Sequence, residues 1–153
     1  MIKICFVCLG NICRSPMAEF IMKDKIKKNN LQDKFLIESK GTSCEEEGND
    51  IYPNVKRILD EKGISYIKRS ATTLVELDYE KYDYFIGMDQ NNIRNMKYLF
   101  NNDPDNKVYR LLDFTNLKKD VEDPWYTRNF EKVYEEINLG CDKLLEIFLK
   151  YNN

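Results

Sequence analysis

Residues 2–16 read IKICFVCLGNICRSP, an apolar run that passes through a short polar loop into a segment with helical spacing. The run at residues 2–7 is long and apolar enough for a central strand that is covered on both faces. A helix is expected over residues 16–28, because Ser15 can cap it and Pro16 suits its first position. The stretch therefore predicts a strand, a loop and a helix in succession, the unit from which parallel sheets are built.

The rest of the 153-residue chain continues this alternation without a repeat or a linker. Further strands are expected at residues 35–38, 84–88 and 108–112, and further helices at 53–62, 90–99 and 129–151. The pattern predicts an α/β fold, a doubly wound parallel sheet flanked by helices, formed by residues 1–153 as a single domain. A ligand is expected beyond the carboxyl ends of the strands.

Composition excludes several functional classes. Charged residues make up 33% of the chain, but their signs nearly cancel to a net charge of -2. This balance argues against nucleic acid or a membrane surface as a partner. The apolar run at residues 1–7 is too short for a signal peptide, so the expected location is cytoplasmic.

Cysteine and histidine content narrows the possible chemistry. Five cysteines in a cytoplasmic chain indicate free thiols rather than a disulfide framework. The chain has no histidine, which excludes Cys-His and Ser-His-Asp machinery and any histidine-ligated zinc. No metal site is expected, and acid-base catalysis must come from another side chain.

The loop after the first strand places Cys8 six residues before Arg14. The start of the following helix attracts anions and favours the thiolate form of Cys8, while Arg14 can hold two phosphoryl oxygens. Gly10 permits close approach of the backbone, Asn11 tolerates a left-handed conformation, and Ser15 can donate to the thiolate. The pattern predicts a phosphatase with a covalent cysteine intermediate. The alternative is a buried structural cysteine near an unrelated arginine, against which the flanking strand and helix argue.

Release of an alcohol or phenol also requires a proton donor. Asp123 lies in the loop before the last helix, ahead of Pro124, which keeps it out of a helical conformation. Trp125 and Tyr126 follow and could wall a slot for an aryl ring. An ordinary Asp-Pro turn is the alternative interpretation of this segment.

Residues 8–15 and the segment Asp123-Pro124-Trp125-Tyr126 together resemble the low-molecular-weight protein tyrosine phosphatases. The resemblance extends over essentially the whole chain. It implies a four-stranded parallel sheet of the phosphotyrosine protein phosphatase I type, an acid phosphatase reaction without cofactor, and a cysteinyl-phosphate intermediate. The implied substrates are phosphotyrosine-containing proteins and small aryl phosphates. Phosphate-like oxyanions would inhibit the enzyme, which is expected to be a monomer or a weak dimer.

The resemblance also implies roles for individual residues. Cys8 is the nucleophile, Arg14 the phosphate clamp, and Asp123 the general acid and then the base. The phosphate-binding loop comprises Leu9, Gly10, Asn11, Ile12, Cys13, Arg14 and Ser15. The residues that would contact the rest of the substrate are Ile12, Glu45, Glu46, Trp125 and Tyr126.

Cys13 has two open interpretations. It lies in the loop of Cys8, close enough for a disulfide that would protect the nucleophile from irreversible oxidation, a switch known in the family. Alternatively it is a small packing residue beneath the loop. Three departures from the family pattern are Lys40, Arg69, where a supporting histidine is frequent, and Arg128.

Two rival functions remain. Arsenate reductases share the loop but need a downstream cysteine pair, which residues 78–100 do not contain. A non-catalytic phosphotyrosine-binding module would be expected to lack Cys8, Arg14 or Asp123, and the chain has all three.

Overall fold

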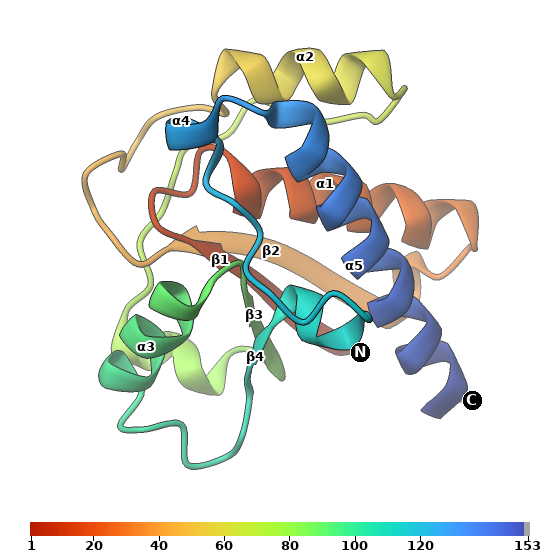
Figure 1. Cartoon of the computed structure of the whole chain (residues 1–153). Coiled ribbons are helices and arrows are strands. Elements are labelled where there is room, and N and C mark those ends of the chain that lie inside the picture. The colour runs from red at the N-terminus through yellow and green to blue at the C-terminus, as the bar shows by residue number, and fades with distance from the viewer. Residues whose placement is uncertain (152–153) are drawn as a thin grey trace.

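The computed structural model describes residues 1–151, whose four strands form one parallel sheet with helices on both faces (Figure 1). The strand order is β2-β1-β3-β4. The strands are β1 Ile2–Cys8, β2 Phe35–Gly41, β3 Tyr84–Gly87 and β4 Val108–Arg110. The α-helices are α1 Arg14–Lys28, α2 Pro53–Glu61, α3 Gln90–Leu99, α4 Pro124–Thr127 and α5 Phe130–Tyr151. Short 3₁₀ helices occur at Gln32–Lys34, Glu76–Glu80 and Leu111–Phe114.

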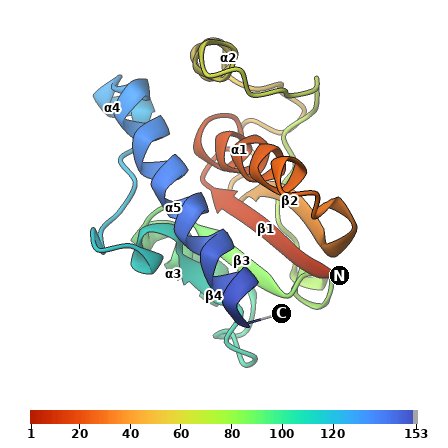
Figure 2. The same cartoon turned by 90° about the vertical axis from the view of Figure 1, so that its right-hand side faces the viewer.

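Alternate residues of the central strand β1 contribute to two separate cores. Ile4 and Phe6 pack into the core on the side of α1 and α5, whereas Cys5 and Val7 pack on the side of α3. The two views of the molecule show α1 and α5 on one side of the sheet and α3 on the other (Figures 1 and 2). The burial of β1 on both faces confirms the prediction made from its apolar sequence.

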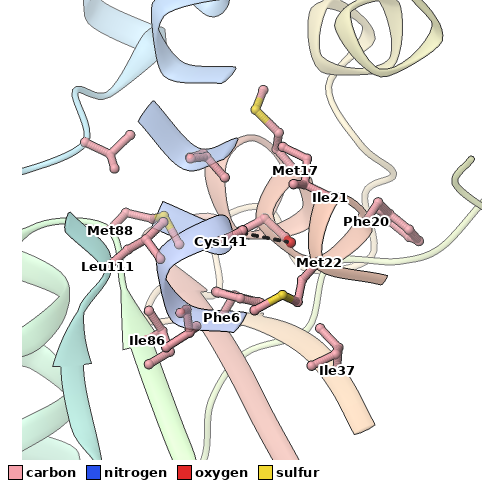
Figure 3. Close-up of a cluster of buried hydrophobic side chains, with 14 of the residues drawn as sticks. Phe6, Met17, Phe20, Ile21, Met22, Ile37, Ile86, Met88, Leu111 and Cys141 are labelled. Carbon is pink, nitrogen blue, oxygen red and sulfur yellow. Dashed lines mark hydrogen bonds between the residues drawn. The ribbon is translucent and has the colours of Figure 1, made fainter. Parts of the chain in front are cut away.

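The larger core lies between the sheet, α1 and α5. Phe6, Ile37 and Ile86 come from three adjacent strands and face Met17 and Met22 of α1 (Figure 3). On the α5 side, the thiol of Cys141 contacts the carbonyl of Ala18, with Sγ 3.9 Å from the oxygen. Within residues 1–151 no helix combines the length and apolarity that crossing a membrane requires.

The start of α1 differs from the sequence prediction. The helix begins at Arg14, so Pro16 is its third residue and Ser15 lies inside it rather than capping it. The N-terminal flanking residue is Cys13, which makes no side-chain capping bond. The loop winds directly into the helix, and this turns the Ser15 hydroxyl back toward Cys8.

Two strands differ from the predicted length by more than one residue. The second strand continues to Gly41, because Ser39 and Lys40 pair with β1 despite their polarity. The fourth strand ends at Arg110, where the chain enters a 3₁₀ helix. Leu111 and Leu112 are fully buried in that helix, so their apolar character reflected packing rather than strand pairing.

Candidate active site

The Cys8 thiol lies at the carboxyl end of β1, almost completely buried. Its Sγ is 3.0 Å from the hydroxyl oxygen of Ser15. The pairing of Cys8 with Gly41 places the end of β2 beside the loop. A Cβ on Gly41 would lie 2.8 Å from the carbonyl oxygen of Leu9, so a glycine is needed here for the loop to pass over the strand.

Hydrogen bonding beneath the loop leaves the proton of Ser15 available to Cys8. Asn11 Nδ2 donates to Ser15 Oγ over 2.9 Å and to Ser39 Oγ over 3.0 Å. The amide orientation is defined because Asn11 Oδ1 accepts from the backbone N–H of Thr72. Since the Ser15 oxygen accepts from Asn11, its single proton is available for Cys8. The arrangement therefore suits a sulfur that accepts, as a thiolate does.

The carbonyl groups of the loop are held on its outer side. Backbone N–H groups of Thr42, Ser43 and Tyr52 donate to the carbonyls of Cys8, Leu9 and Ile12, respectively. In a trans peptide the next N–H points the opposite way, so the amides of Leu9, Gly10 and Cys13 face inward.

Two further features favour this arrangement. Asn11 has a left-handed φ of 58°, which helps the loop to turn its amides inward. The amides of residues 9–13 donate to no other group in the part of the chain that the structure describes. They form a ready anion-binding cradle at the start of α1.

Arg14 is buried, and its guanidinium is already oriented. Nη1 donates to Asp89 Oδ2 over 2.7 Å and to the carbonyl of Val121 over 3.0 Å. Nη2 is 3.6 Å from Asp123 Oδ2. Burial lowers the pKa of Arg14, but the negative charges of Cys8, Asp89 and Asp123 outweigh it and raise this pKa above its ordinary value. The guanidinium is therefore a permanent cation beside the cysteine.

Asp123 precedes α4, which the sequence did not predict as a helix. Its backbone is extended, as expected before Pro124, and its Oδ1 accepts from the N–H of Trp125 over 2.9 Å. The side chain is 27% exposed and lies near both Arg14 and the pocket. Its second oxygen can thus reach a ligand.

A pocket of about 210 Å³ opens above the loop. Its lining residues are Cys8, Leu9, Gly10, Ile12, Cys13, Arg14, Ser43, Glu45, Glu46, Asp123, Trp125 and Tyr126. Twelve residues from the two ends of the sequence and from the loop after β2 thus meet at one site. The structure brings together all of the predicted residues except Asn11 and Ser15, which lie beneath the loop rather than in the pocket.

Trp125 and Tyr126 form the aromatic side of the pocket, and residues outside the pocket pack against Trp125. Tyr52 packs edge-on against Trp125, with ring centroids 5.5 Å apart. The guanidinium carbon of Arg128 lies 5.3 Å from the Trp125 ring centroid, and Arg128 Nη1 donates to the Tyr52 hydroxyl over 3.3 Å. Tyr126 is 80% exposed, so it forms the outer part of the rim.

Cys13 is buried at the pocket's inner edge. Burial, together with the nearby Cys8 and Asp123, raises the pKa of Cys13 to about 12. The other cysteines lie outside the pocket: Cys5 and Cys141 are buried, and Cys44 is exposed. In residues 1–151 no cluster of three or more His, Cys, Asp or Glu side chains could hold a metal ion.

Sequence reasoning missed several residues of the site. Asp89 was not among the predicted site residues, yet besides capping α3 it accepts a hydrogen bond from Arg14. Asp89 follows the predicted third strand and so lies at the same sheet edge as the Cys8 loop, and this position could have indicated its role. No role in the site was predicted for Ser39, Thr72 or Ser43, because their contacts depend on which loops become neighbours.

Comparison with known proteins agrees with this geometry. Residues 3–152 match the family model for low molecular weight phosphotyrosine protein phosphatases. The low molecular weight protein-tyrosine-phosphatase PtpA of Staphylococcus aureus is 38% identical over 154 residues, covering 100% of this chain and 97% of that protein.

Solved structures give the same assignment. YfkJ from Bacillus subtilis superposes with a TM-score of 0.96 at 39% identity, covering 100% of this chain and 98% of that one. The low molecular weight protein tyrosine phosphatase of Streptococcus pyogenes has a TM-score of 0.86 at 38% identity, with 100% of both chains covered. The chain belongs to the low-molecular-weight protein tyrosine phosphatase family and is a phosphoric monoester hydrolase.

Proposed function

We propose that this enzyme hydrolyses phosphotyrosine in proteins, and small aryl phosphates, through a cysteinyl-phosphate intermediate. One observation carries the proposal: the Cys8 thiol, the Arg14 guanidinium and the Asp123 carboxyl converge on one pocket above the inward-facing amides. Cys8 is the nucleophile, Arg14 the clamp for phosphoryl oxygens, and Asp123 the acid and base.

In the first step the Cys8 thiolate attacks phosphorus opposite the ester oxygen. The S–P bond forms as the P–O bond breaks, and a protonated Asp123 delivers its proton to the departing phenolate. Arg14 and the loop amides stabilise the charge on the three equatorial oxygens.

In the second step water attacks the phosphorus of the cysteinyl phosphate. Asp123, now a carboxylate, takes a proton from that water, the S–P bond breaks, and inorganic phosphate leaves. The proton of Ser15 supports the returning thiolate of Cys8.

The substrate class follows from the pocket's walls. Trp125 and Ile12 border it, so a phenyl ring can pack there while its phosphate reaches the loop. Phosphoserine is shorter and has no ring for these residues to hold, so we expect it to be a poorer substrate. Phosphotyrosine-containing proteins are therefore the proposed partners, and phosphate-like oxyanions the proposed inhibitors.

Asp123→Asn tests the acid with little change in shape, since Asn can still accept from Trp125 N–H. The wild type and this variant are assayed on phosphotyrosine, phosphoserine, phosphoarginine and an aryl phosphate with a good leaving group. On phosphotyrosine kcat/KM, which reports the first step, should fall by about a hundredfold to ten-thousandfold, and much less where the leaving group needs no proton. An equal loss of kcat/KM on all substrates, or a preference for phosphoserine or phosphoarginine, would contradict the proposal.

Cys8→Ser tests the nucleophile. Turnover of aryl phosphates should be abolished while phosphate binding, measured by calorimetry, is retained, because Arg14 and the loop amides remain. Substantial activity in Cys8→Ser would refute a cysteine nucleophile. Inactivity of the reduced wild type on every aryl phosphate would instead support the non-catalytic binding module.

We further propose that Cys13 protects Cys8 during oxidation. Peroxide converts the Cys8 thiolate to a sulfenic acid, and the Cys13 sulfur attacks it, forming a disulfide and releasing water. Wild type should then regain most activity on treatment with a thiol, whereas Cys13→Ser should regain much less. Equal recovery of both proteins after peroxide would assign Cys13 a packing role only.

A further inference from the structure

Arg69 binds the main chain of the phosphate loop from outside the pocket. Its Nη2 donates to the carbonyl of Asn11, and its Nη1 donates to the carbonyl of Asn49 over 3.1 Å. Its own backbone N–H donates to Asp50 Oδ1 over 3.2 Å. One side chain thus joins the phosphate loop to the loop after β2.

The carbonyl that Arg69 binds belongs to the most constrained residue of the loop. Asn11 has a φ of 58°, a conformation that disfavours any residue with a Cβ. The side chain of Asn11 donates to Ser15, whose hydroxyl reaches Cys8. Any movement of the Asn11 backbone would therefore displace the only hydroxyl that the structure places on the Cys8 sulfur among the described residues.

Arg69 also places a positive charge close to the acidic groups and cysteines around the loop. Burial lowers the pKa of its guanidinium, and the nearby Glu19, Cys8, Asp50 and Cys13 oppose that effect. An arginine remains protonated at neutral pH even so. It thereby adds a second permanent cation, besides Arg14, near the loop cysteines.

We propose that Arg69 is a positioning residue for the phosphatase reaction: its guanidinium holds the Asn11 carbonyl and thereby keeps Ser15 on Cys8. The inference rests on the proposed cysteine mechanism. The step most dependent on Arg69 is the second one, in which the Cys8 thiolate leaves phosphorus and the Ser15 proton supports it.

Arg69→Met removes the donors while keeping an unbranched apolar stem. With an aryl phosphate, we expect a rapid first release of phenol and then turnover about tenfold or more below wild type, because a charged hydrogen bond is lost. Arg69→Lys should restore part of kcat, and so should millimolar guanidinium ion added to Arg69→Met. Arg57→Met is the matched control, since Arg57 is exposed on α2 and its side chain binds no other described residue.

The outcomes separate the alternatives. Wild-type turnover in Arg69→Met, or a loss that neither lysine nor guanidinium ion restores, would overturn the positioning role. If Arg69→Met does not fold by circular dichroism, Arg69→Lys against Arg69→Gln provides the same comparison, with higher kcat expected for lysine. Failure of the cysteine mechanism would show separately, as activity in Cys8→Ser with Arg69 intact.

Discussion

Arg14 illustrates how a single side chain is prepared before a ligand arrives. Its Nη1 is occupied by Asp89 and by the Val121 carbonyl, so the guanidinium plane cannot rotate freely. Nη2 remains on the side of Asp123 and the pocket. A buried arginine without these acceptors would lose more free energy by desolvation than an exposed one, so Asp89 also stabilises the folded loop.

Asp89→Asn should therefore reduce kcat/KM by about tenfold to a hundredfold, the value of one charged hydrogen bond. Asparagine can still accept from the N–H of Asn92 and cap α3, but its amide NH2 group would then face the buried Arg14 guanidinium, so the melting temperature should fall as well. Steady-state kinetics and thermal unfolding check the two expectations. Asp120→Asn is the control, because Asp120 also accepts at the start of α3 but pairs with Arg110. Equal activity losses in both variants would contradict a specific role of Asp89.

At the scale of elements, one carboxylate organises the loop between β2 and α2. Asp50 Oδ2 accepts from Lys56 over 2.7 Å, and Oδ1 accepts from the backbone N–H groups of Ile51 and Arg69. The hydrogen bond from Lys56, assisted by these two amides, lowers the pKa of Asp50 to about 2. The same loop carries Glu45 and Glu46 to the pocket, so its order matters for the rim.

Asp50→Asn should destabilise the protein at neutral pH and much less in acid. A carboxylate with a lowered folded pKa contributes stability above its unfolded pKa, about 3.9, and loses it as the pH falls toward 2. The free-energy difference between wild type and variant, from urea unfolding, should thus be larger at about pH 7 than at about pH 3. Lys56→Met should show the same trend. A difference independent of pH would mean that Asp50 acts through shape alone.

At the scale of the whole molecule, α5 closes the core over the sheet. Gly140 lies in the middle of α5 against Leu111, where an added Cβ would be 2.5 Å from the leucine Cγ. Leu111 is fully buried near Met88 and Ile86 (Figure 3), so it has little room to move. The absence of a side chain at Gly140 sets how closely the last helix approaches the rest of the fold.

Gly140→Ala should lower the melting temperature by several degrees. Alanine favours the helix by about 1 kcal/mol over glycine, but overpacking a rigid core costs about 1–3 kcal/mol. Calorimetry of Gly140→Ala and of Glu135→Ala, an exposed substitution on the same helix, separates the two effects. A melting temperature equal to or above wild type in Gly140→Ala would show that α5 can shift to accept the methyl group.

The sequence by itself determined the central strand, the spacing of Cys8 and Arg14 in the loop, and the order of strands and helices along the chain. These depend on local spacing: Cys8 and Arg14 are separated by one turn of backbone, and β1 is apolar on both faces. Asp123 could also be proposed as the acid without a structure, because the lack of histidine left a loop carboxylate as the expected proton donor.

The tertiary structure alone decided which groups hold the loop in place. The partners of Arg14 lie 75 and 107 residues away, and Asn11 binds groups 28 and 61 residues away. Parallel strands bring their carboxyl ends to one sheet edge, but the strand order selects which loops meet there. For the same reason, only the assembled fold showed that Ser15 lies inside α1 instead of capping it. It also showed that Arg69 contacts Asn11.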